Sequence, residues 1–205
     1  NNGVSRFSAR LNLDQELSEY VSFGLTATYS QNKYDNVPLG DNANEYSGVL
    51  TGAIQSNPTI PIYDSEGNYF IDPKRPFVAN PVSLLDIKDN TVKDRIIGSA
   101  FVSVKPLKDL EVKLQLGVDR SFQKRSSYLP KTTLQGANKN GRADISQETS
   151  TTYLMELTAQ YSKSFGDHNL KAIGGYSFQK FKNDGLSAGN EDFLVDGFGY
   201  NSLGS

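Results

Sequence analysis

The sequence predicts an all-β fold, namely an antiparallel segment of a transmembrane β-barrel with about six strands in three hairpins. Three observations lead to this prediction. Stretches of about ten or more residues alternate apolar and polar side chains, and tight and long connections follow one another in strict alternation. The chain also has no run of about 18 apolar residues, which excludes a membrane-spanning helix but not spanning strands, whose signal is much weaker.

The first hairpin is expected over residues 4–14 and 20–34, joined by a tight turn at 15–19. Every second residue of each strand is apolar, so one face of the sheet is apolar and the other polar. The apolar face takes Phe7, Ala9, Leu11 and Leu13 from the first strand and Val21, Phe23, Leu25, Ala27 and Tyr29 from the second.

A long connection follows over residues 35–94 and holds six of the eight prolines. A short helix is expected within it at 45–55, because Tyr46, Leu50 and Ile54 recur at helical spacing. So long a loop is unusual in a compact soluble domain. In a membrane barrel it is an ordinary external loop.

The second hairpin is expected over residues 95–105 and 110–124, with a tight turn at 106–109 and a long loop at 125–142 after it. Residues 110–119 show the alternation most clearly, with polar side chains at the odd positions 111, 113, 115 and 119. The apolar side chains, which we expect to face lipid, are those of Leu110, Val112, Leu114, Leu116 and Val118.

The third hairpin is expected over residues 144–163 and 170–181, with a tight turn at 164–169 and a final loop at 182–205. Ile173 interrupts the polar face of its last strand, so the alternation defines the register less firmly there.

All of residues 1–205 are assigned to one β-barrel domain. Short turns of such barrels lie on the periplasmic side and long loops outside, which gives each connection its expected side. Six strands are too few to close a transmembrane barrel, so we expect an internal piece of a longer polypeptide. Aromatic residues near the strand ends suggest interfacial girdles, although aromatics are also common in strands generally.

Composition excludes several other classes of protein. The formal net charge is -2 and no basic block occurs, so no nucleic-acid partner is expected. The absence of Cys rules out disulfides and thiolate metal sites. Neither a metal site nor a cofactor is expected.

One catalytic motif occurs, but its context does not support an enzyme. Residues 185–189 (GLSAG) match the nucleophile elbow of hydrolases around Ser187. The only histidine, His168, lies before this serine rather than after it, and no helix is evident behind the motif. We therefore expect a flexible Gly/Ser loop there and no catalytic residue.

The long loops supply the candidate contacts for a substrate or partner. Residues 64–68 (DSEGN) are expected to form a plain turn, although their oxygens leave cation binding open. Aromatic side chains could stack on sugar rings or meet a partner, or else pack the loop's own small core. They are Tyr46, Tyr63, Tyr69, Phe70 and Phe77.

Four segments, taken together, resemble a known family. They are residues 57–69 (NPTIPIYDSEGNY), 80–82 (NPV), 106–110 (PLKDL) and 168–176 (HNLKAIGGY). Their order and spacing are similar to the central barrel region of the SusC/RagA-type TonB-dependent outer-membrane transporters of Bacteroidetes. The resemblance covers most of the chain.

The resemblance implies a 22-stranded parent barrel with a plug, located in the bacterial outer membrane and surrounded by its lipid. It implies uptake of glycans or peptides as nutrients, with a SusD-like surface lipoprotein as partner. TonB would supply energy through parts of the protein absent from this chain. This sequence gives no residue-level substrate site that the resemblance could supply.

One alternative remains open at this stage, a soluble β-sandwich that serves as a carbohydrate-binding or adhesin module. Its apolar strand face would meet a second sheet instead of lipid. Turn signals in a sandwich recur every 8–12 residues, whereas the strands expected here are longer.

Overall fold

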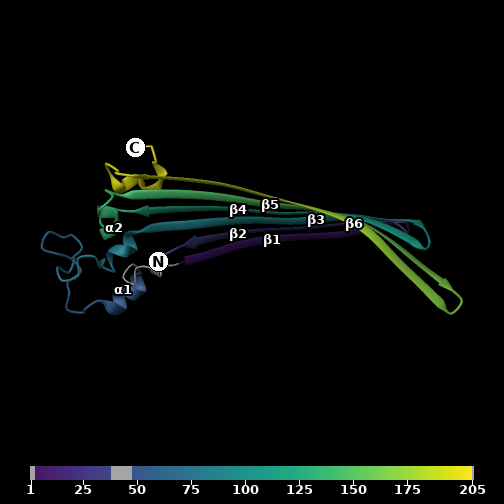
Figure 1. The fold of residues 1–205 in the computed structure, drawn as a ribbon, viewed down its shortest axis with the longest axis horizontal. Coiled ribbons are helices and arrows are strands. Elements are labelled where there is room, and N and C mark those ends of the chain that lie inside the picture. Colours follow the sequence, from purple (N-terminus) through teal and green to yellow (C-terminus); the bar gives the residue numbers. More distant parts are fainter. Residues whose placement is uncertain (1–2, 38–47, 205) are drawn as a thin grey trace.

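The computed structural model describes residues 3–37 and 48–204. The strands form one antiparallel sheet in which each strand pairs with the next along the chain (Figure 1). This confirms the predicted all-β class and its three hairpins. The strands are β1 Gly3–Ser18, β2 Val21–Asp35, β3 Lys88–Leu107, β4 Leu110–Leu129, β5 Arg142–Phe165 and β6 His168–Glu191.

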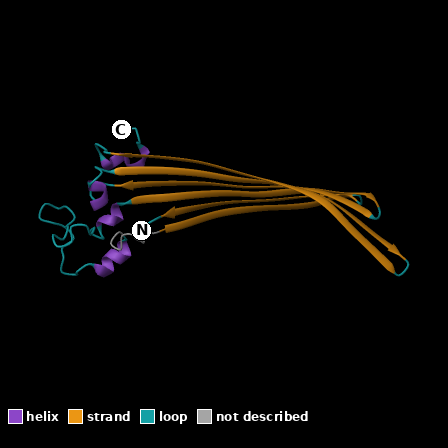
Figure 2. Ribbon diagram, viewed as in Figure 1, coloured by secondary structure: helices purple, strands orange, loops and turns teal. Residues whose placement is uncertain are grey.

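Helices are short and gather at one end of the sheet with the long connections (Figure 2). We call this the loop end, and the opposite end, where the tight turns lie, the turn end. None of the helices in the described part of the chain has the length and apolar character needed to cross a membrane. They are α1 Val49–Gln55, α2 Leu134–Ala137 and the 3-10 helices η1 Ser83–Asp86 and η2 Asp196–Asn201.

Most strands extend further than the alternation predicted. β3 begins at Lys88 and β6 continues to Glu191, so the three loops are shorter than expected. Each turn at the turn end shrinks to two residues, at 19–20, 108–109 and 166–167. The reason is that backbone ladder bonds continue wherever two chains lie side by side, whether or not the side chains alternate.

The short helix expected at 45–55 is present in part, because α1 begins at Val49. Positions 45–47 fall outside the described residues, and Tyr46 is one of them.

The strand register places the alternating apolar side chains of all six strands on one face. Pairing shifts only near the turn end, between Glu16 and Ser18 and between Val104 and Leu107. Ile173 lies opposite Gln160 on the other face, so the polar face keeps its predicted register. One row across the sheet reads Leu13, Leu25, Ala100, Leu116, Met155 and Phe178.

A glycine on the polar face allows one aromatic ring to lie flat against the sheet. Gly24 lies directly opposite Phe101, and a Cβ at Gly24 would collide with the Phe101 ring. The Lys113 Nζ lies over the same ring, 4.2 Å from its centre. The ring covers the backbone that the glycine leaves bare, which is a known way of stabilising glycine in strands.

We expect Gly24→Val to destabilise the protein by about 1–3 kcal/mol, because the added atoms displace the Phe101 ring. Urea unfolding of the folded protein in detergent measures this. Adding Phe101→Ala should recover part of the loss. Gly174→Val is the matched control, since nothing lies within 4 Å of a Cβ there. Equal losses in both glycine variants would contradict this account.

Candidate functional site

The candidate functional site is the apolar face of the sheet, defined here as the face that carries Leu114. Leu114 lies between Val102 of β3 and Leu157 of β5. The exposed fractions of Leu114, Leu116 and Val118 are 38%, 49% and 36%. No second sheet lies over this face in the part of the chain that the structure describes. The arrangement therefore leaves a wide apolar surface that must find its partner elsewhere.

The five side chains expected to face lipid share this surface. Leu110, Val112, Leu114, Leu116 and Val118 occupy alternate positions of β4 and pair with apolar-face residues of β3 and β5. Their contact with lipid itself stays a prediction.

The apolar residues form a band of nearly constant length. It covers residues 7–13, 21–29, 96–104, 110–118, 153–161 and 170–178, one range for each strand. Most of these ranges hold nine residues, which extend about 30 Å at 3.3 Å each. Tilted by about 40°, such a strand spans roughly 23 Å, close to the apolar height of outer-membrane barrels.

The edge of the band also shifts along the strand direction from each strand to the next, as tilted strands require. Directly paired residues, followed from strand to strand, lead from Phe7 of β1 to Asp184 of β6. The apolar range of β6 ends at Phe178, six residues nearer the turn end. A shift of six residues over five strand-to-strand steps keeps the band level when the strands lean, as they do in a barrel.

Amphipathic side chains mark the edge of the band nearest the loop end. The Tyr29 hydroxyl donates to Asp94 Oδ1 at 2.7 Å, and Gln31 Nε2 donates to the same oxygen at 2.9 Å. The Tyr29 ring lies 6.3 Å from the Phe7 ring on the apolar side. A ring with an apolar body and a polar tip suits the boundary between lipid and water, which supports the girdle interpretation.

The opposite, polar face carries its own paired groups. Arg95 forms a two-pronged contact with Asp119, at 3.0 Å and 2.6 Å. The Ser103 hydroxyl donates to Glu111 at 2.6 Å. These partly exposed pairs suit a hydrated surface, because water still reaches them and no charge is buried alone.

A small core holds the loop end together. Tyr128, Ala143 and Phe193 are buried against one another, and the Tyr128 and Phe193 rings meet edge to face at 5.7 Å. The Tyr128 hydroxyl donates to Asp196 Oδ1 at 2.5 Å, and the Lys131 backbone N–H donates to Asp196 Oδ2 at 3.2 Å. We call this unit, residues 128–143 with 191–204, the cap.

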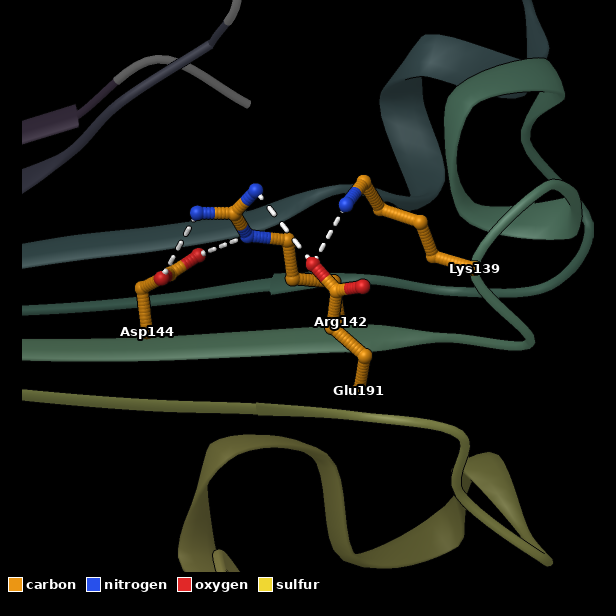
Figure 3. A network of polar contacts seen from close by, with 4 residues as sticks. All are labelled: Lys139, Arg142, Asp144 and Glu191. Carbon is orange, nitrogen blue, oxygen red and sulfur yellow. Dashed lines mark hydrogen bonds and ion pairs between the residues drawn. The ribbon is translucent and has the colours of Figure 1, made fainter.

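Charged side chains continue the cap onto the strand ends (Figure 3). Glu191, the last residue of β6, accepts from Lys139 at 2.5 Å and lies 3.5 Å from the Arg142 guanidinium. Arg142 also forms a fork with Asp144, at 2.7 Å and 3.0 Å. The network joins the loop after α2 to β5 and β6, and so anchors this loop to the end of the sheet.

Four of the five expected loop aromatics can be placed, and only two of them meet. Tyr63 and Tyr69 stack with ring centres 5.3 Å apart. Phe70 lines a pocket, whereas Phe77 is 91% exposed. Tyr46 lies outside the described residues. A substrate or partner role for any of these residues stays a prediction.

The Tyr69 hydroxyl fastens its loop to the cap side of the molecule. It donates to Asp86 Oδ2 at 3.0 Å, and the Thr132 hydroxyl donates to the same oxygen at 3.1 Å. Burial, together with the nearby Asp86 carboxylate, raises the pKa of Tyr69 to about 12. The hydroxyl therefore stays protonated and remains a donor throughout the physiological pH range.

The pocket beside Phe70 has a volume of about 300 Å³. Its walls include Pro58, Ile60 and Val78, together with Arg75 and Asp72, which lie 3.6 Å apart. This volume is at the low end for ligand sites, so the pocket suits one small apolar group. The sequence alone could not reveal this pocket, because its walls come from separate parts of residues 53–82 that meet only in the folded loop.

Residues 64–68 have the geometry of a turn. Asp64 Oδ1 accepts from the backbone N–H groups of Glu66 and Asn68, at 2.9 Å and 2.8 Å. The hydrogen bond from the Asn68 amide is the main reason that the pKa of Asp64 lies below its usual value. Gly67 completes the turn at a φ of 87°. No group of three or more potential metal ligands occurs among residues 3–37 and 48–204.

The expected Gly/Ser loop at 185–189 is wrong, because these residues lie within β6. Ser187 pairs with Ser146 of β5 in the regular ladder. A nucleophile elbow needs a sharp turn between a strand and a helix, and a continuous strand provides none. Extended pairing with β5 overrides the flexible composition of the segment.

Comparisons with known proteins agree with this geometry. No family model matches the chain. TonB-dependent receptors P3 and P26 of Formosa agariphila are 28% and 26% identical to it over 99% and 98% of its residues. The chain spans about a fifth of their length, 21% and 20% respectively.

A solved structure of the RagAB peptide transporter is similar to the whole chain, with a TM-score of 0.78 and 20% identity, over 23% of the solved chain. The "open-open" state of the RagAB peptide importer gives a TM-score of 0.74 over 95% of this chain and 22% of that one. At this identity the likeness concerns the fold.

These comparisons confirm the expected resemblance to TonB-dependent receptors in sequence and to part of the RagAB transporter in fold. An outer-membrane location for this chain is taken up below as part of the proposed function. The names describe receptors and transporters, in agreement with the expectation that the chain is not an enzyme.

We expect Tyr128→Phe to lower the free energy of unfolding by roughly 1–2 kcal/mol, because Asp196 loses its hydroxyl donor inside the cap. Urea unfolding measures the change. Tyr34→Phe is the control, since the Tyr34 hydroxyl makes no hydrogen bond within the described residues. A loss of the same size in the control would show that the Asp196 contact is not responsible.

The 64–68 turn should loosen in acid. A carboxylate whose pKa is lowered on folding stabilises the fold fully above its usual pKa and loses this effect as pH falls through the lowered value. Hydrogen-exchange protection of the Asn68 amide should therefore fall below about pH 4. Asp64→Ala should remove both the protection and its pH dependence, whereas Glu66→Ala should keep both. Unchanged protection in Asp64→Ala would refute the turn mechanism.

Proposed function

We propose that this chain is a wall segment of a TonB-dependent outer-membrane importer that takes up glycans or peptides as nutrients. The observation that carries the proposal is the nine-residue apolar band, whose staggered edge would be level if the strands were tilted, and which is backed by a polar face. Contact with lipid would remove the apolar face from water, and a water-filled barrel interior would suit the polar face. The similarity to TonB-dependent receptors supports the same conclusion.

The loop end would then face outside and the turn end the periplasm. The two-residue turns and the long, structured loops fit the usual asymmetry of such barrels. A SusD-like lipoprotein is the proposed partner at the loop end, where Phe77 and the cap are exposed for contact. TonB would act through parts of the protein outside this chain, and the parent barrel would have 22 strands.

Within this proposal the chain contributes a fixed wall rather than a reactive group. Substrate would pass along the polar face, where hydroxyl and charged side chains such as Thr26 and Arg95 keep the surface hydrated. The description of RagAB as a peptide transporter supports keeping peptides beside glycans as the substrate class.

The soluble β-sandwich considered from the sequence has no support in the structure. Its second sheet is missing from the described residues, and the strands hold 15 to 24 residues each. Strands of a sandwich are usually much shorter.

The proposal predicts unequal costs for arginine at two neighbouring positions in the full-length protein. Leu114→Arg should cost about 2–4 kcal/mol, because it places a charge against lipid near mid-depth. Gln115→Arg should cost little, because it faces water beside Glu156. Reversible unfolding in lipid vesicles measures both values, and equal costs would contradict the membrane placement.

A further inference from the structure

The apolar face changes character just beyond the band, toward the loop end. On β4 and β6 the first residue of this face beyond the band is basic and exposed, and on β4 Phe122 lies between two basic residues. Arg120 is the first such residue after Val118, and Lys180 is the first after Phe178. We call the group the basic strip, and it consists of Arg120, Lys124, Lys180 and Lys182.

The strand register brings these cations close together around β5. Arg120 lies opposite Thr151, and Thr151 lies opposite Lys182, so the three share one row. Lys180 lies opposite Tyr153 in the adjacent row. Two strand spacings separate β4 from β6, about 10 Å, and flexible basic side chains can close that distance around one anionic group.

The basic strip is little neutralised by the protein. Arg120, Lys124 and Lys180 make no ion pair or hydrogen bond within residues 3–37 and 48–204. Asp184 is the single acid on this face of β4 to β6 beyond the band, and it pairs with Lys182 at 3.2 Å. Four cations therefore face one anion.

Other parts of the same face show no such excess. Beyond the band, β1 to β3 carry two cations, Lys33 and Lys88, and two acids, Asp35 and Asp94. At the turn end, Lys163 follows the band on β5 and lies 3.8 Å from Asp109. The basic charge is thus concentrated on one boundary of the band and on one half of the sheet.

We propose that the basic strip binds the phosphate groups of anionic lipids in the outer leaflet. The inference rests on the proposed membrane placement, which puts these residues at the level of the lipid headgroups. The strip continues directly from the lipid-facing band, so an amphiphile can meet both surfaces at once. Arginine and lysine reach phosphate oxygens from such positions.

The test uses the full-length protein in phosphatidylcholine vesicles, with or without phosphatidylglycerol. Native mass spectrometry measures the ratio of anionic to neutral lipid retained. The test variant combines Arg120→Gln, Lys124→Gln and Lys180→Gln, which leaves the Lys182 pair intact. Each removed charge should lower the anionic preference about fivefold. The control combines Arg6→Gln, Arg10→Gln and Lys93→Gln, the same charge change on the polar face, and should keep the preference.

Each result supports or overturns the lipid site. An equal fall in both variants would overturn it, because the effect would then follow from net charge alone. Inorganic phosphate added to phosphatidylcholine vesicles should not displace retained phosphatidylglycerol, and full displacement would indicate a free-anion site instead. Protease protection reports insertion separately. A protein that inserts without anionic preference refutes the lipid site alone, whereas one that never inserts refutes the membrane placement and this inference with it.

Discussion

Everything in this structure depends on the continuous backbone ladder between neighbouring strands. Side chains in a strand alternate between faces, so a slip of one residue in any pairing would move that strand's apolar set to the polar face. The ladder runs from β1 to β6 with irregularities only near the turn end. The apolar band, its staggered edges and the opposite polar face all follow from that one constraint.

The two ends of the sheet solve the problem of chain reversal differently. At the turn end two residues suffice, and Gly166 adopts a positive φ of 57° to allow one such turn. At the loop end the chain reverses through segments that need their own support. Tyr128, Phe193 and Asp196 provide it, by burying two rings and satisfying a carboxylate between elements far apart in sequence.

The six strands and their faces could be predicted because the alternation of apolar and polar residues is a local property, which a stretch of about ten residues is enough to reveal. Strand ends could not, since pairing continues beyond the alternation, as at Lys88 and Glu191. The Gly/Ser segment around Ser187 was mistaken for a loop because composition does not report a neighbouring strand. The cap was missed for a related reason, since Tyr128 and Asp196 are 68 residues apart and share no motif.

The length of β6 beyond the band has a consequence for how such a protein diversifies. From residue 179 to Glu191 the strand runs about 40 Å further, or roughly 30 Å in height when tilted. Under the proposed membrane placement, these strand extensions would hold the cap well above the bilayer surface. On that proposal, sequence changes in the cap would leave the lipid-facing band unaltered, so the loop end and the membrane-spanning part of one sheet could diversify separately.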